Sequence, residues 1–210
     1  MKEEEYRLIR QTGKDLTSKI FKFGLEKKEE FINAAKLLGF WNNNKLEFES
    51  DEEFDVLTEF FIFEKFKQNS RIVERFSNSN TELTELEKEN MKGILNFHSS
   101  LFEIKNVDPK NNTLVLSDLL EDNHFEYNLI DINLSHSSTY GLIFYSRLLP
   151  IQDCYMTSGV SFPFEMSDKN KLLTVISLAT FKKRSKLTTS EIFLLMHKKH
   201  QQFGAKVRTL

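Results

Sequence analysis

The spacing of apolar residues changes once along the chain, close to Leu101. Before Leu101, apolar residues recur every three or four positions, which is the period of a helix with one buried face. The clearest such stretch contains Phe54, Leu57 and Phe61. After Leu101, apolar and polar residues alternate in short runs, as they do in strands with one buried face. The pattern therefore predicts helices first and a small sheet after them.

Three capping boxes indicate where helices begin. In such a box a Ser or Thr and a Glu three residues later each satisfy a free backbone N–H of the first turn. Another helix, within KKEEFINAAKLLGFW, is expected to stop near Gly39, because glycine favours the left-handed conformation that ends many helices. The capping pairs are Ser50 with Glu53, Thr84 with Glu87, and Thr188 with Glu191.

Four or five short strands are expected in the second half of the chain. They come from LFEIKNV, TLVLS, FEYNLIDI, LIFYSRLLP and CYMTSGVSFPF, the last a strand or strand pair broken at Gly159 and Pro163. DPKNN predicts a turn between the first two, because Pro109 fixes φ and asparagine tolerates left-handed backbone. Short strands at close spacing are typical of a small antiparallel barrel.

We therefore expect an α+β protein with three regions. Helices occupy residues 1–100, a small antiparallel sheet or SH3-like barrel occupies residues 101–166, and C-terminal helices occupy residues 167–210. We expect these regions to pack around one continuous core. Since the chain has 20 phenylalanines among 210 residues, aromatic rings should fill much of that core.

Composition limits the classes of function. A net charge of −2 does not indicate a general nucleic-acid binder. The single cysteine, Cys154, excludes an internal disulfide and a cysteine-only zinc site, and it fits a reducing compartment. The N-terminus lacks the apolar region of a secretory signal, and no apolar run approaches the roughly 20 residues that cross a bilayer. We expect a cytoplasmic protein without membrane contact.

Charge is unevenly distributed along the chain. Residues 45–66 carry eight acids and two lysines, whereas residues 181–210 carry eight Lys or Arg and one acid, Glu191. A basic cluster can bind phosphates without reading a base sequence, although such runs are more often a solvated surface. It can instead attract the acidic helices of the same chain. The candidate nucleic-acid-binding residues are Lys182, Lys183, Arg184, Lys186, Lys198 and Lys199.

Several segments, in their order, resemble a known module. They are LTELEKENMKGILNFHSSLFEI, LVLSDLL, LIFYSRLLP and a small-residue SG pair. The order resembles a module of uncharacterised bacterial proteins, some of which also carry SEC-C-type zinc motifs. The likeness covers residues 50–176, and its most specific residues are Asp118, Arg147 and Gly159. It implies the fold and a bacterial setting. A zinc role does not carry over, because that motif needs clustered cysteines.

Arg147 stands alone within an apolar strand, so its guanidinium is expected to be partly buried. A buried guanidinium needs a carboxylate or several carbonyls around it. Asp118, at the end of an earlier strand, is the candidate partner. We expect a structural ion pair that fixes strand register; the alternative is an anion-binding arginine that faces a groove.

The sequence gives little support to a catalytic site or a metal site. Cys154, His136 and Asp131 are the residue types of a nucleophile, a base and an orienting acid, but their spacing does not indicate that they meet. His197 and His200 share one side of a helix, yet Lys198 and Lys199 between them would repel a cation. We expect no metal and no cofactor.

The leading hypothesis is a non-enzymatic binding or scaffold protein that contacts another protein, whose identity the sequence does not give. The runner-up is a nucleic-acid-associated accessory factor that uses the basic C-terminal segment. A hydrolase built on Cys154 and His136 is the third and weakest hypothesis, because glycine-rich phosphate loops and hydrolase motifs are missing from the sequence. The sequence does not indicate an oligomeric state.

Overall fold

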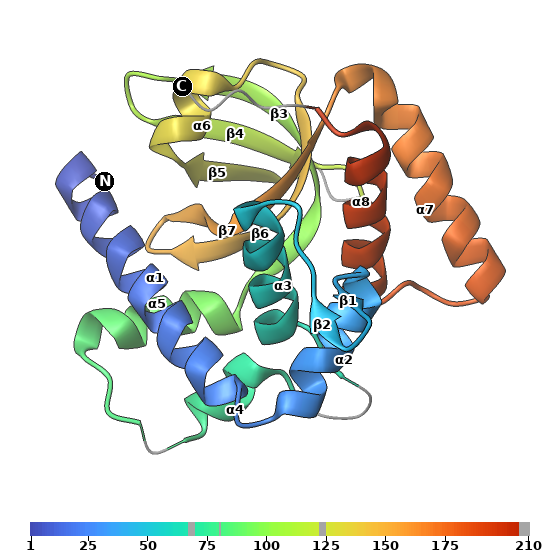
Figure 1. Cartoon of the computed structure of the whole chain (residues 1–210). Coiled ribbons are helices and arrows are strands. Elements are labelled where there is room, and N and C mark those ends of the chain that lie inside the picture. Colours follow the sequence, from blue (N-terminus) through green and yellow to red (C-terminus); the bar gives the residue numbers. More distant parts are fainter. Residues whose placement is uncertain (67–69, 80, 122–124, 206–210) are drawn as a thin grey trace. The chain divides into compact units, whose positions relative to one another are not determined.

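The computed structural model describes residues 1–66, 70–79, 81–121 and 125–205, and the chain forms two compact units (Figure 1). Unit 1 spans residues 1–96 and unit 2 spans residues 97–210. Unit 2 contains the strands of a barrel together with the C-terminal helices. This confirms the expected α+β class with a small SH3-like barrel. The single continuous core stays a prediction.

Unit 1 is helical because its apolar residues recur at helical spacing and its ends carry stop signals. Phenylalanines fill its interior: the ring of Phe21 forms T-shaped contacts with Phe31, Phe54 and Phe61 at centroid distances of 5.7–6.0 Å. Gly39 ends the second helix in the left-handed conformation, as expected. The helices are α1 (Glu3–Gly24), α2 (Lys28–Leu38), α3 (Asp51–Phe63), α4 (Ile72–Ser77) and α5 (Glu85–Leu95).

A two-stranded hairpin, β1 (Trp41–Asn42) and β2 (Lys45–Leu46), interrupts the helices of unit 1. Asn43 and Asn44 form its turn with φ values of 47° and 60°. Asparagine adopts this left-handed backbone more readily than most residues, which suits a tight hairpin turn. These strands were not expected from the sequence, because two residues are too few to show alternation.

Two of the three predicted capping boxes are confirmed. The hydroxyls of Thr84 and Thr188 accept hydrogen bonds from backbone N–H groups in the first turns of α5 and α8 (Thr189–Phe203). Ser50 does precede α3, but its side chain makes no capping hydrogen bond. Glu53 instead accepts from the backbone N–H of Glu49 at 2.7 Å, one residue further back than the box requires.

Unit 2 contains a closed five-stranded barrel with neighbours in the order β3-β4-β5-β7-β6. Most pairs are antiparallel, but β5 and β7 are parallel where Leu129 opposes Tyr155. The C-terminal strand is continuous, with Gly159 at φ 136°, a backbone conformation that favours glycine. The strands are β3 (His98–Asp108), β4 (Thr113–Asp118), β5 (Glu126–Ile130), β6 (Ile143–Ile151) and β7 (Cys154–Phe164).

Alternation along each strand separates an apolar interior from the outer face of the barrel. The interior is filled by aromatic and aliphatic side chains, which form a buried cluster of Phe102, Ile104, Leu114, Leu116, Tyr127, Leu129, Phe144 and Leu148. Tyr145 of β6 and its cross-strand partner Phe162 of β7 point outward and pack against Phe193 of α8. Helix α8 therefore covers part of the outer face of β6 and β7.

The remaining helices of unit 2 are short or peripheral. The predicted polar loop NLSHSST contains a helix, α6 (Ile132–Ser137), because Asp131 caps it by accepting from the backbone N–H of Leu134 at 2.9 Å. A 3-10 turn, η1 (Met166–Asp168), leads into α7 (Lys169–Lys183). The first residue of α7 is tied to β3, since Lys169 Nζ lies 2.6 Å from the buried carboxylate of Glu103.

Candidate functional site

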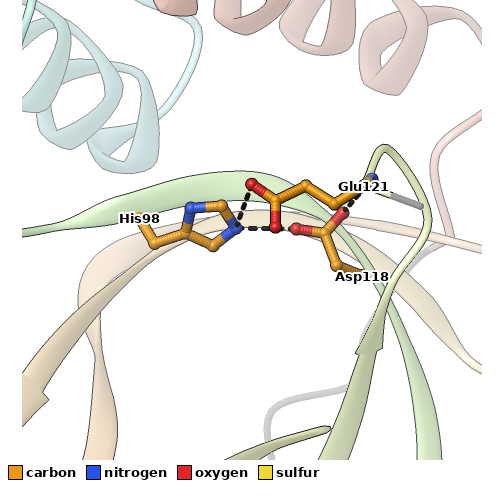
Figure 2. Close-up of side chains that lie close together, drawn as sticks. All are labelled: His98, Asp118 and Glu121. Carbon is orange, nitrogen blue, oxygen red and sulfur yellow. Dashed lines mark hydrogen bonds and ion pairs between the residues drawn. The ribbon is translucent and has the colours of Figure 1, made fainter. Parts of the chain in front are cut away.

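Three potential metal ligands meet at one end of the barrel in unit 2 (Figure 2). His98 is the first residue of β3, Asp118 is the last residue of β4, and Glu121 follows Asp118 by three positions in the sequence. His98 Nε2 lies 2.6 Å from Asp118 Oδ2 and 4.0 Å from Glu121 Oε1. We call these three residues the barrel-end cluster.

The barrel pleat explains why the cluster forms. Phe102 opposes Asp118 across β3 and β4, so both side chains lie on the inner face of the sheet. Two and four residues earlier on β3, Ser100 and His98 lie on that same face. Both reach Asp118: Ser100 Oγ donates to Oδ1 at 2.5 Å and the His98 ring approaches Oδ2.

Asp118 is held rigidly. Its side chain is fully buried, and besides Ser100 its Oδ1 accepts from the backbone N–H groups of Leu120 at 2.7 Å and Glu121 at 3.2 Å. Three donors on one oxygen leave Oδ2 directed at His98. Burial acts to raise the pKa of Asp118, but the hydrogen bonds from His98, Ser100 and Leu120 outweigh it and hold the pKa below its usual value.

The imidazole of His98 is fixed by an aromatic neighbour. The ring of Tyr127 stacks on it with centroids 5.2 Å apart and planes 3° apart, while Phe102 contacts it in a T-shape. The hydrogen bond to Asp118 raises the pKa of His98 in spite of the opposing effect of burial. Burial, together with the charges of Glu121 and Asp118, raises the pKa of the Tyr127 phenol to about 12.

This arrangement can do two things chemically. It can share a proton between the imidazole and two carboxylates, or it can offer one nitrogen and two oxygen ligands to a cation. In either case Glu121 is the adaptable member, because its side chain is 41% exposed whereas Asp118 is fully buried. Asp118 is a residue that the sequence pattern indicated, whereas His98 and Glu121 are not.

Arg147 lies on the other face of the sheet. It opposes Ser99 of β3 and precedes the inward-facing Leu148, so its guanidinium points outward and lies 4.7 Å from the ring centre of Phe193. Asp118 points inward, and the interactions that the structure describes for its carboxylate do not include Arg147. Asp118 and Arg147 thus lie on opposite faces of the sheet, and their ion pair stays a prediction.

The residues of the hydrolase hypothesis have separate roles. Cys154 begins β7 and its thiol donates to the backbone carbonyl of Ile151 at 3.3 Å. Asp131 caps α6, and His136 is exposed near the end of that helix. Within the described part of the chain, the hydrogen bonds of Cys154 and Asp131 given above do not involve His136.

The predicted basic cluster lies at the end of α7, in the following loop and on α8. Lys182, Arg184 and Lys186 are exposed. Lys183 is partly neutralised, since its Nζ lies 2.5 Å from Glu191 Oε2, and Lys199 Nζ bonds the amide oxygen of Gln202 at 2.9 Å. Lys198 is also exposed, and the basic residues 206 and 208 lie outside the described part of the chain.

Apolar side chains accompany the basic residues on α7. Of its fifteen residues, all of them described, only Leu172 is buried. Leu178 is 54% exposed and Phe181 is 80% exposed. The two are three positions apart, so they lie on one side of the helix. We call Leu178, Phe181, Lys182, Arg184 and Lys186 the α7 surface.

His197 and His200, the other histidine pair considered, are packing residues of α8. Their rings contact Phe162, each at a centroid distance of 5.5 Å. Burial, with a smaller effect of His200, lowers the pKa of His197 to about 4. Burial also lowers the pKa of His200. Neither belongs to a described group of three potential metal ligands.

Comparison with known proteins identifies a family. The sequence model of a family described as "Family of unknown function (DUF7986)" matches residues 1–210. No curated protein matches the chain, and no solved structure matches it. Among the described residues, no helix combines the length and the apolar character that crossing a bilayer requires.

Proposed function

The chain belongs to the DUF7986 family, whose function is unknown, and we propose from its own surface that it is a non-enzymatic binding protein. It acts through the α7 surface, and its partner is a protein with an apolar groove bordered by carboxylates. The observation that carries the proposal is Phe181, an aromatic residue that is 80% exposed and is followed in the sequence by exposed cations. A cytoplasmic location and a bacterial source stay predictions.

The apolar composition of α7 supports the proposal that this helix contacts another protein. Leu172, Leu173, Val175, Ile176, Leu178, Ala179 and Phe181 are spread around the helix at 100° per residue. A helix that is apolar on all sides is normally buried on all sides. Here Leu178 and Phe181 remain exposed, and such grouped exposed apolar residues mark interaction surfaces. Aromatic residues, phenylalanine among them, are also enriched in protein–protein interfaces.

Charge indicates what the partner must present. From Lys169 to Ser190 the chain has no acidic residue. Lys169 forms an ion pair with Glu103, and Lys183 with Glu191, whereas Lys182, Arg184 and Lys186, which follow Phe181 in the sequence, are exposed. Carboxylates on a partner would complement these three cations and steer the encounter.

A protein partner suits this surface better than nucleic acid. Phosphate binding needs cations alone, and it gains nothing from an exposed leucine beside the aromatic ring. An apolar groove with an acidic border would contact the apolar residues of the α7 surface and pair with its cations. The nucleic-acid hypothesis is therefore kept as an outcome of the experiment.

The experiment places a photo-crosslinking amino acid at position 181 in the source cell. Tyr140, 71% exposed in a turn of unit 2, is the matched control position. Proteins captured at 181 but not at 140 are purified, and their affinity for the full chain is measured. Capture alone does not count as support.

We expect Phe181→Ala to weaken the purified complex by roughly tenfold, in line with about 1–2 kcal/mol for truncation of an aromatic anchor. The triple variant Lys182→Glu, Arg184→Glu, Lys186→Glu should weaken it further and reduce its salt dependence. Lys110→Glu, at another exposed position of unit 2, should have little effect. Lys183 is left intact because it contacts the Glu191 cap of α8.

Three results would contradict the proposal. The first is equal capture at positions 181 and 140. The second is an affinity unchanged by Phe181→Ala. The third is salt-dependent binding of a labelled duplex, abolished by the triple charge reversal while Phe181→Ala has no effect; that result would support nucleic-acid binding instead.

A further inference from the structure

The barrel-end cluster carries an inference that is independent of the α7 surface. We infer that His98, Asp118 and Glu121 bind one divalent transition-metal ion, Zn²⁺ or Mn²⁺, through His98 Nε2, Asp118 Oδ2 and Glu121 Oε1. The site lies at the end of the barrel where β3 begins and β4 ends (Figure 2).

The three ligand atoms are already close together. All lie within 4.8 Å of one another, with the imidazole nitrogen 2.6 Å and 4.0 Å from the two carboxylate oxygens. Ligands on one ion at about 2.1 Å stand roughly 3–3.5 Å apart. A small opening of the His98–Asp118 distance and an inward rotation of Glu121 meet that requirement. Glu121 has the freedom to rotate because its side chain is partly exposed.

The surroundings orient the ligands as metal sites require. Ligating carboxylates and imidazoles are usually held by a further layer of contacts. Asp118 Oδ1 accepts from Ser100, Leu120 and Glu121, which leaves Oδ2 for the ion. Tyr127 stacks on the His98 ring and fixes its plane. Two ligands are therefore preorganised, and the third closes on the ion.

The donor set selects the kind of metal. One imidazole nitrogen with two carboxylate oxygens suits Zn²⁺ and Mn²⁺. Ca²⁺ takes six to eight oxygen ligands, which three side chains with one nitrogen do not supply. Three protein ligands also leave at least one position for water, as in sites that bind a further ligand at the metal.

The test uses the full chain after treatment with a chelator. Zn²⁺ or Mn²⁺ is added as the chloride, and binding is measured by calorimetry and by elemental analysis of the dialysed protein. Co²⁺ serves as a spectroscopic probe, because its visible absorption reports nitrogen and oxygen coordination. We expect one ion per chain.

Two variants define the site. Glu121→Gln should weaken binding at least about tenfold, and His98→Gln should abolish stoichiometric binding. His136→Gln, an exposed histidine of α6, should bind as the parent does. Circular dichroism shows whether each variant is folded, and Glu121→Gln keeps the test decisive if His98→Gln is not.

The inference is overturned if the parent binds none of the three ions stoichiometrically. It is also overturned if folded Glu121→Gln and His98→Gln bind as the parent does, since the ion then lies elsewhere. A change in the Co²⁺ spectrum with His136→Gln, but not with Glu121→Gln, would likewise place the ion outside the barrel-end cluster and overturn the inference.

Discussion

The surroundings of two histidines in unit 2 shift their pKa values in opposite directions. His98 stands beside Asp118, and this hydrogen bond raises its pKa. His197 lies among aromatic rings of the outer barrel face, where burial lowers its pKa to about 4. The two residues therefore make stability depend on pH in opposite directions.

For His98 the folded pKa lies above the unfolded value of 6.5, so its contribution is fully present below pH 6.5 and is lost as pH rises through the folded pKa. For Asp118 the folded pKa lies below 3.8, so its contribution is present above pH 3.8 and is lost as pH falls through the folded value. Their hydrogen bond is thus strongest in mildly acidic solution.

His197 gives a prediction with the opposite sign. Its folded pKa of about 4 lies below the unfolded value of 6.5, so the unfolded state binds the proton first as pH falls. Between pH 6.5 and 4 this should remove up to about 3 kcal/mol from the free energy of unfolding of unit 2, at about 1.4 kcal/mol per pKa unit.

Hydrogen exchange of β6 and β7 amides at pH 7 and pH 4.5, corrected for intrinsic rates, measures that loss. We expect His197→Phe to lose much less protection between the two values than the parent does, whatever its stability at pH 7. The exposed His136→Gln serves as the control and should follow the parent. An unaltered loss in His197→Phe would contradict the assignment.

Single residues show where prediction from sequence stopped. Alternation placed Phe102 and Ile104 on one face of a strand from Leu101, but the strand starts at His98. Alternation counted back from Phe102 through Ser100 places His98 on the same face of the sheet as Asp118. The partner of a buried charge is harder to predict. Asp118 points into the barrel and Arg147 points out of it, and this difference depends on the strand pairing.

The residues that precede α8 and α3 allow a direct comparison of a helix with a capping hydrogen bond and a helix without one. The Thr188 hydroxyl accepts from the backbone N–H of Glu191 at 3.3 Å, whereas Ser50 makes no such bond in front of α3. We expect Thr188→Ala to destabilise α8 by about 1 kcal/mol, the usual cost of losing an N-cap. Ser50→Ala should cost α3 clearly less.

Hydrogen exchange of the amides in the first turns of α8 and α3 measures both effects in the same protein. Equal losses of protection would show that the capping hydrogen bond is not the cause. A larger effect at Ser50 would contradict the geometry described for α3.

Local patterns predicted elements well and their pairing poorly. Each of the five strand segments is confirmed, because alternation is a property of neighbouring residues. The parallel pairing of β5 with β7 depends on residues that are far apart in sequence, namely Leu129 and Tyr155. Helix α6 was missed because its first turn depends on one capping carboxylate, Asp131, within a polar segment.

At the scale of the whole molecule, the division near residue 96 leads to a further prediction. A unit with its own core can usually fold alone. We expect residues 97–210, produced without unit 1, to give dispersed amide resonances and the circular dichroism of a mixed α and β fold. The expectation of one continuous core predicts the opposite, an unfolded or aggregated fragment. Cooperative thermal unfolding of the fragment distinguishes the two outcomes.

Closure of the barrel limits how its strands can meet another chain. In an open sheet the outermost strand offers free backbone N–H and C=O groups, and an extended peptide can add to it as a new strand. In the ring β3-β4-β5-β7-β6 each strand already has a neighbour on both sides. Peptide addition to β4, which pairs with β3 on one side and with β5 on the other along its length, would therefore require breaking pairs, so recognition there falls to side chains. Among the described residues β5 and β7 pair at Leu129 and Tyr155 alone.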